Sequence, residues 1–217
     1  SPKVLDKLET IIVAGEACPS ELVNMWGRDY HFFNAYGPTE ATIWTTTAKC
    51  EPGKKMTIGK PLDNVDVFVL DEQLNLLPKG SVGELYIGGI GLCSGYLYRE
   101  DLNKEKFISK TFRDGKERLL YATGDMVRWN QEGELDFLGR KDSQVKLRGF
   151  RIETDEIRAS ILDYLKAQDA VIGIINKGGL DVLYAVVKSG LGPHQTRTAQ
   201  EIRAYLKTQL PHYMVPD

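Results

Sequence analysis

The chain has 217 residues, 42% of them apolar, which is enough to bury the core of one large or two modest domains. Its 28 basic and 30 acidic residues form no long run of one sign, which argues against nucleic acid or an anionic membrane as a partner. Three widely spaced cysteines without a C-x-x-C spacing argue against a disulfide framework or a zinc site, and favour a reducing, cytoplasmic setting. No apolar run approaches the ~20 residues of a membrane span, and "SPKVLDKLET" has neither the features of a signal peptide nor those of a natural N-terminus.

The beginning of the chain has the pattern of an α/β sheet. Residues 10–14 ("TIIVA") predict a buried strand, and residues 19–26 predict a short helix with Pro19 in its first turn. Residues 31–34 predict a second short strand. We therefore expect residues 1–50 to form a piece of an α/β sheet.

From about residue 51 the pattern changes to short β runs separated by turn residues. The runs are "VDVFVL", "GELYIGG", "RLLYATG", "DMVRWN" and "ELDFLGR". The stretch "VRWNQEGELDFL" predicts a hairpin with "NQEG" as its turn. Residues 51–140 are therefore expected to form an antiparallel barrel or sandwich.

After Arg140 the pattern changes again, to that of a small α+β domain. The segment "QVKLRGFRI" is strand-like, and a helix begins at Thr154 with an apolar stripe of Ile157, Ile161 and Leu165. Residues 170–175 and 183–187 predict strands around an "NKGGLD" turn. A capping box, Thr198-x-x-Glu201, opens a last helix that buries Ile202, Tyr205, Leu206 and Leu210 and ends at Pro211.

The stretch "NAYGPTEATIW" joins a tight Gly-Pro turn to a Thr-Glu pair at the end of a strand. Thr39 and Glu40 in such a turn indicate phosphate oxygens and a magnesium ion. The glycine-rich "GGIGLCSGY" does not fit a dinucleotide fingerprint, because Gly89, Gly91 and Gly95 have the wrong spacing and no helix follows directly. A loop that needs positive φ angles explains these glycines better.

A carboxylate and a group of basic residues follow. Asp125 comes after a Thr-Gly turn in "YATGD", where it could accept both hydroxyls of a ribose or, equally, cap backbone amides. The segment "LGRKDSQVKLRGFRIE" carries Arg140, Lys141, Lys146, Arg148 and Arg151, which could equally be a solvated basic face. None of these features decides the function by itself.

The order and spacing of the motifs resemble the adenylate-forming enzymes, and among them the amino-acid adenylation domains of nonribosomal peptide synthetases. The matching segments are "NAYGPTE", "GELYIGGIGLCSGYLYRE", "YATGDMVRW", "GRKDSQVKLRGFRIE" and "LPHYMVP". The resemblance covers essentially the whole chain. It implies a C-terminal half: residues 1–50 would end a large α/β core, 51–140 would be its barrel-like subdomain, and 141–217 a truncated mobile lid.

The resemblance implies that an amino acid is activated with ATP and then loaded on the phosphopantetheine thiol of a carrier protein, in the biosynthesis of an antibiotic or another secondary metabolite. Tyr36 would stack on adenine, Thr39 would bond phosphate, Glu40 would hold Mg²⁺, and Asp125 would take the ribose hydroxyls. Arg140 would reach the ribose or phosphate. The surroundings of the base would be Gly15, Glu16, Ala17, Asn34, Ala35 and Gly37.

The resemblance also implies a moving lid. Asp142 would be the hinge between two lid orientations, one for each step. Lys146, Arg148 and Gly149 would enter the site only in the second orientation. Lys146 could instead be a plain surface lysine.

The side chain of the amino acid would be recognised partly by Ile12, Ala14, Ala35, Ile43 and Trp44. This lining carries no charge, so we expect a neutral, apolar substrate of small or medium size. If Trp44 points into the core, the longer pocket would admit an aromatic substrate.

The phosphate-binding loop and most of the core would lie upstream, and the lysine that closes on the substrate carboxylate would lie downstream. We therefore expect residues 1–217 alone to be inactive without the remaining N-terminal part. An MbtH-like protein is a further possible partner. The alternatives are a stand-alone D-alanine–carrier ligase, an acyl-CoA ligase, or a non-catalytic binding fragment that pairs with a complementary chain.

Overall fold

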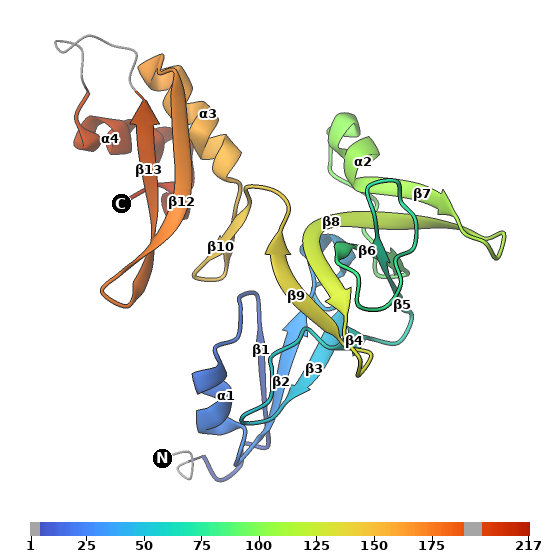
Figure 1. Ribbon diagram of the computed structural model, residues 1–217. Coiled ribbons are helices and arrows are strands. Elements are labelled where there is room, and N and C mark those ends of the chain that lie inside the picture. The colour runs from blue at the N-terminus through green and yellow to red at the C-terminus, as the bar shows by residue number, and fades with distance from the viewer. Residues whose placement is uncertain (1–4, 189–196) are drawn as a thin grey trace. The chain divides into compact units, whose positions relative to one another are not determined.

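The computed structural model describes residues 5–188 and 197–217 (Figure 1), and the chain divides into two compact units, residues 1–141 and 142–217. Each unit has its own hydrophobic core, as its mixed pattern of strands and helices requires. In the described residues, no helix is both long and apolar enough to cross a membrane.

A four-stranded sheet opens the first unit, in the order β1-β2-β3-β4. Its strands are β1 (Thr10–Ala14), β2 (His31–Tyr36), β3 (Thr46–Cys50) and β4 (Lys60–Pro61). β1 and β2 are parallel and are connected through α1 (Ser20–Trp26), whereas β3 and β4 are antiparallel to their neighbours. The core on this sheet is built from Val23, Phe32, Ala48 and Cys50.

A five-stranded antiparallel sheet completes the first unit. Its strands are β5 (Val65–Leu70), β6 (Gly83–Gly89), β7 (Phe107–Thr111), β8 (Glu117–Trp129) and β9 (Leu135–Arg140). The order is β5-β6-β8-β7, and β9 pairs with the second half of β8. α2 (Glu100–Lys106), which precedes β7, was not predicted, and neither was β7.

The predicted Thr-Gly turn before Asp125 is wrong, because β8 runs through Thr123 and Gly124 without a break. Gly124 takes a positive φ of 76°, and the pairing of β6 with β8 shifts register between Glu84 and Tyr86. The glycine therefore permits a local irregularity inside one long strand. Asp125 lies directly after it and pairs with Arg140 on β9.

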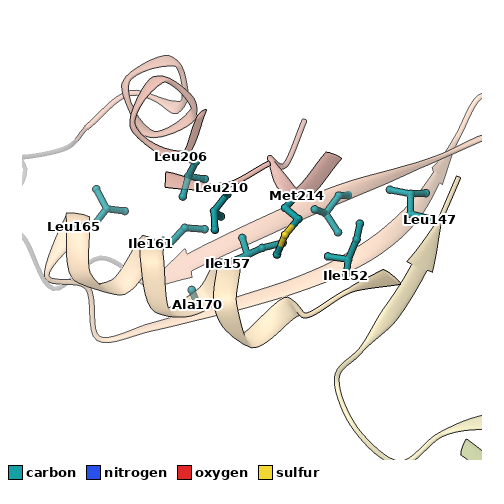
Figure 2. Close-up of a cluster of buried hydrophobic side chains, with 10 residues drawn as sticks. Leu147, Ile152, Ile157, Ile161, Leu165, Ala170, Leu206, Leu210 and Met214 are labelled. Carbon is teal, nitrogen blue, oxygen red and sulfur yellow. The ribbon is translucent and has the colours of Figure 1, made fainter. Parts of the chain in front are cut away.

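The second unit packs two helices on a β-hairpin. The long hairpin consists of β12 (Asp169–Lys177) and β13 (Leu180–Lys188), and the helices are α3 (Thr154–Leu165) and α4 (Ala199–Gln209). Figure 2 shows the apolar stripe of α3 facing Leu206, Leu210 and Met214 in the core of this unit. The predicted capping box is present, since Thr198 Oγ1 accepts from Glu201 N at 3.2 Å and Glu201 Oε2 accepts from Thr198 N at 2.8 Å.

Two segments of this unit differ from the prediction, one by a turn that was not predicted and one by a tighter turn. The segment "QVKLRGFRI" is a hairpin of β10 (Val145–Leu147) and β11 (Phe150–Ile152), which turns at Arg148 and Gly149 with φ of 53° and 78°. The "NKGGLD" turn narrows to Gly178 and Gly179 because its flanking residues continue the strands. The predicted mixed class is confirmed: an α/β sheet and an antiparallel sheet are followed by a small α+β unit.

Candidate functional site

A buried cluster forms where the end of β2 meets the middle of β8 and the end of β9. Asp125 is only 4% exposed. The Tyr36 hydroxyl donates to Asp125 Oδ2, and Arg140 Nη1 donates to Oδ1 at 2.7 Å. Three residues from separate sequence motifs are therefore brought into direct contact.

The surroundings of Tyr36 in this cluster keep its phenol protonated. Burial, followed by the charge of Asp125 and its hydrogen bond, raises the pKa of Tyr36 well above its ordinary value. The phenol therefore stays protonated and acts as the donor to the carboxylate. Backbone bonds also hold Asp125 in place, because its N–H donates to Thr123 Oγ1 at 3.0 Å and Thr123 Oγ1 donates to Leu85 O at 2.7 Å. The result is a carboxylate with a fixed orientation.

Glu40 is the second buried carboxylate near the end of β2. It lies in a single turn of 3₁₀ helix, Thr39–Ala41, directly after the Gly37-Pro38 pair. Glu40 is 7% exposed, whereas Thr39 at the start of the turn is exposed. The hydroxyl of Tyr96 donates to Glu40 Oε1.

The turn around Glu40 depends on Gly37 and on unusual backbone angles. A Cβ at position 37 would lie 2.5 Å from Ile43 O and 2.8 Å from Thr45 N, so only glycine allows the chain to return this closely. Thr42 and Ile43 both have positive φ, which is uncommon for β-branched residues. Strained backbone of this kind costs about 1–3 kcal/mol for each residue and concentrates at functional sites.

The donor set around Glu40 fits a magnesium ion that is shared with a phosphate group. Mg²⁺ is usually held by one or two carboxylates together with substrate phosphates and water. In the part of the chain that the structure describes, no three His, Cys, Asp or Glu side chains form a group that could hold a metal. Glu40 and the exposed Thr39 hydroxyl together supply one carboxylate and one hydroxyl, which is the kind of donor set that a phosphate-bound Mg²⁺ uses.

The residues predicted around the base lie at the carboxyl ends of the parallel strands β1 and β2. Ala14 and Ala35 are register partners, and Gly15, Glu16 and Ala17 follow β1 as exposed residues. The Asn34 side chain is held within the unit, because its Nδ2 donates to Thr57 O at 2.8 Å. The assignment of these residues to the base stays a prediction.

Three of the predicted substrate-pocket residues lie largely exposed on the first unit. Ile12, Ile43 and Trp44 are 48%, 66% and 39% exposed. A cavity of about 440 Å³ lies elsewhere and contains none of them. It is lined by residues 48–51, 54–57, 130–132, 134 and 136. The pocket assignment stays a prediction.

The predicted residues of the second unit lie on and before the β10–β11 hairpin. Lys146 is exposed and pairs in register with Arg151, and Arg148 Nη2 donates to Asp181 O at 3.3 Å. Asp142 Oδ1 accepts from Gln144 N at 3.2 Å. The hinge at Asp142 and the second-step role of Lys146 stay predictions.

Sequence reasoning missed the polar groups that hold the two carboxylates. Tyr96 contacts Glu40 across 56 positions, and its hydroxyl lies 3.3 Å from that of Tyr121. Phe137 packs against the Tyr36 ring, with centroids 6.3 Å apart. The only sequence signal for Tyr96 was its place in the glycine-rich loop.

Comparison with known proteins agrees with the motif order. Residues 1–97 match the AMP-binding enzyme family. The chain is 44% identical over 213 residues to bacitracin synthase 3 of Bacillus licheniformis, and the match covers 98% of the chain but 3% of that protein.

Two solved structures have a similar fold. One is the Vibrio cholerae adenylation domain AlmE in complex with glycyl-adenosine-5'-phosphate, at 28% identity and a TM-score of 0.81, covering 100% of this chain and 42% of that one. The other is PA1221, an NRPS protein containing adenylation and PCP domains, at 25% identity and a TM-score of 0.81, covering 99% of this chain and 43% of that one. The chain therefore spans less than half the length of each of these three proteins.

Proposed function

We propose that the chain, whose residues 1–97 match the AMP-binding enzyme family and which is similar to bacitracin synthase 3, is the C-terminal part of an amino-acid adenylation domain of a nonribosomal peptide synthetase. The complete domain would activate an amino acid with ATP and load it on a carrier protein. The observation that carries the proposal is the buried contact of Tyr36, Asp125 and Arg140, because three separate family motifs supply one residue each.

The reaction has two steps. An oxygen of the amino-acid carboxylate attacks the α-phosphorus of ATP, the bond to pyrophosphate breaks, and an aminoacyl adenylate forms. A phosphopantetheine thiol of the carrier then attacks the acyl carbon, gives up its proton and expels AMP. Both steps depend on positioning and on stabilising negative charge.

The cluster at Asp125 suits the sugar of the nucleotide. A fixed carboxylate can accept hydrogen bonds from both hydroxyls of a ribose. Tyr36 and Arg140 hold the two oxygens of Asp125 in the observed geometry, and both of these bonds are charge-assisted. We assign Asp125 to the ribose, the Tyr36 ring to the adenine, and Arg140 to the ribose or phosphate.

Thr39 and Glu40 suit the phosphates. Glu40 would hold Mg²⁺, and Thr39 would donate to a phosphate oxygen from the exposed start of the 3₁₀ turn. When bound, the metal would neutralise charge on the leaving pyrophosphate. The Glu40 carboxylate would supply the fixed negative charge that holds this metal beside the phosphates.

The second unit would act as a lid that pivots at Asp142. Its hairpin carries Lys146 on an exposed strand, where it can approach a substrate without exposing buried surface.

The proposed partners are a peptidyl carrier domain, the remaining N-terminal part of the adenylation domain and an MbtH-like protein. The similarity to PA1221, which contains adenylation and PCP domains, supports the first of these.

The residues assigned to the substrate pocket are Ile12, Ala14, Ala35, Ile43 and Trp44, and they carry no charge. An ionised substrate side chain would therefore lose water without gaining a partner from them. We propose a neutral substrate side chain of small or medium size.

Amino-acid-dependent ATP–pyrophosphate exchange on the complete domain tests the function. We expect exchange with a neutral amino acid, followed by transfer to a carrier protein. Exchange with fatty or aryl acids only, or transfer only to free coenzyme A, would establish an acyl-CoA ligase instead. Exchange restricted to D-alanine would favour the stand-alone ligase, and a preference for a charged amino acid would overturn the substrate assignment.

A further inference from the structure

The glycine-rich segment at residues 88–96, whose spacing does not fit a dinucleotide fingerprint, is hydrogen-bonded to the turn that carries Glu40. Cys93 N donates to Glu40 O at 2.8 Å, and Thr42 Oγ1 donates to Gly91 O at 2.6 Å. The Tyr96 hydroxyl adds a third bond, to the Glu40 carboxylate itself. The loop therefore contacts both the backbone and the side chain of the Glu40 turn.

We propose that Tyr96 is a positioning residue that orients the Glu40 carboxylate toward the magnesium ion, an inference that rests on the proposed function of Glu40. A carboxylate has two oxygens and can rotate about its last bond. Holding Oε1 with a hydroxyl donor restricts that rotation, and hydrogen-bonded partners of this kind orient metal ligands in many sites.

The direction of the hydrogen bonds follows from counting protons. A tyrosine hydroxyl has one proton to donate, and that of Tyr96 is given to Glu40. Tyr121 therefore must be the donor in its 3.3 Å contact with Tyr96. Tyr121 is only 1% exposed, so this relay from Tyr121 through Tyr96 to Glu40 starts from a rigid core position.

Tyr96 itself is held by Asn103, which lies on α2. Asn103 Oδ1 accepts from Tyr96 N at 2.6 Å, and Asn103 Nδ2 donates to Tyr96 O at 2.9 Å. The ring of Phe107 meets the Tyr96 ring at 67°, with centroids 5.8 Å apart. A residue needed only to fill space would not require both of its backbone polar groups to be fixed by one side chain.

The space for Asn103 is provided by Gly95. Gly95 has a φ of 120°, and a Cβ there would lie 2.8 Å from Asn103 Oδ1. The glycine thus allows Asn103 to reach the Tyr96 backbone. This gives part of the glycine-rich segment a purpose other than phosphate binding.

The test is the affinity of the complete domain for Mn²⁺, as a substitute for Mg²⁺, in the presence of a non-hydrolysable ATP analogue. Electron paramagnetic resonance measures free and bound Mn²⁺ directly. For Tyr96→Phe, which removes one oxygen atom, we expect the Mn²⁺ dissociation constant to rise about 10-fold. The affinity for the analogue without metal should not change, which a general loss of structure would not permit.

Three further variants complete the design. Tyr98→Phe is the matched control, because Tyr98 is two residues away and 92% exposed, and we expect wild-type affinity. Tyr121→Phe leaves the Tyr96 hydroxyl in place as the donor to Glu40, and it should raise the Mn²⁺ dissociation constant only about 2- to 3-fold. Glu40→Gln should lose most of the Mn²⁺ affinity.

Wild-type Mn²⁺ affinity in Tyr96→Phe, together with lost affinity in Glu40→Gln, would overturn the positioning role and leave the proposed function intact. Wild-type affinity in Glu40→Gln would overturn both, since the carboxylate would then not be the metal ligand. Equal loss of metal and analogue binding in Tyr96→Phe would also overturn the inference, because it would indicate a structural role only.

Discussion

Within residues 5–141, the described part of the first unit, four carboxylates are buried, whereas the buried side chains among the described residues of the second unit carry no charge. The four are Glu40, Glu84, Asp125 and Asp136. Among its described residues, the second unit buries only two polar side chains, Gln144 and Thr154, next to a core of aliphatic side chains. Burying a carboxylate is costly unless it is paired and hydrogen-bonded. The contrast separates a first unit with fixed, buried carboxylates from a second unit whose described core is almost entirely apolar.

Two of these carboxylates are paired in a way that explains them structurally. Glu84 accepts from Lys141 Nζ at 2.5 Å and from Gly124 N at 2.9 Å, and Asp136 accepts from Lys55 and Arg128. Glu40 and Asp125 differ from them in position, because the Glu40 turn and the Tyr36–Asp125 contact both lie at the end of β2. A tyrosine hydroxyl does not distinguish them, since Tyr86 also donates to Glu84 Oε2 at 3.1 Å. The second unit instead presents Lys146, Arg148 and Arg151 on an exposed hairpin.

The largest expected effect comes from removing the charge of Glu40. In the complete domain, Glu40→Gln should lower the turnover number for adenylation about 100- to 1,000-fold. Without the Glu40 carboxylate the Mg²⁺ ion would be held poorly, and the negative charge on the leaving pyrophosphate would no longer be neutralised. Initial-rate pyrophosphate exchange at saturating ATP measures it. Exposed Glu72→Gln is the control, and a wild-type turnover number in Glu40→Gln would remove the metal assignment.

The next effect tests whether the two units are independent. Ile161 lies in the core of the second unit, and Ile161→Ala should lower that unit's free energy of unfolding by about 2–4 kcal/mol through the cavity it leaves. Chemical denaturation measures this loss. Nucleotide affinity should remain at the wild-type level, and Val171→Ala, at a 57% exposed position, should have little effect on either quantity. A parallel fall in nucleotide affinity would contradict the division of roles.

A smaller effect separates the two steps. Lys146→Ala should slow transfer to the carrier about 10-fold by removing one charge-assisted contact, and should leave pyrophosphate exchange unchanged. Single-turnover loading of a carrier protein measures the second step, with Lys177→Ala on the same unit as the control. Equal loss in both steps would show that Lys146 also serves adenylation.

The smallest effect concerns an exposed carboxylate of the second unit. The hydrogen bond from Arg158, followed by the one from Ala170 N, lowers the pKa of Asp169. Its contribution to stability is therefore present above the unfolded pKa, about 3.9, and is lost as the pH falls through the lower folded pKa. NMR titration of the carboxyl carbon should show this lowered pKa, and Arg158→Gln should raise it toward the ordinary value. A titration unchanged in Arg158→Gln would contradict the cause.

Periodicity and capping signals predicted most of the fold, because apolar faces and caps are local properties. The limits of β1, the start of α3 and the capping box at Thr198 followed from them. The prediction that β1 is buried is wrong, because β1 is an edge strand with exposed and half-buried residues. The continuation of β8 through Thr123 and Gly124 could not be predicted, since it depends on pairing with β6 and β9. A Thr-Gly pair predicts a turn locally, and tertiary pairing overrode it.

The candidate site was predictable only as separate motifs. The residues Tyr36, Asp125 and Arg140 were chosen by resemblance, but their mutual hydrogen bonds join positions up to 89 apart. The same holds for Tyr96, which no motif role pointed to. Contacts over such separations depend on the register of β8 with its neighbours, which the sequence does not state.

The most direct test of the central claim, that the first unit holds a nucleotide through its buried carboxylates, is calorimetric binding of ATP and of 2',3'-dideoxy-ATP to the complete domain. The wild-type protein should bind ATP at least about 10-fold more tightly than the dideoxy analogue, because Asp125 accepts bonds from the ribose hydroxyls. Asp125→Asn, which keeps the shape and removes the charge, should bind ATP more weakly and largely lose this discrimination. If Asp125→Asn still discriminated as well as the wild type, Asp125 would not be the ribose ligand and the central claim would be contradicted.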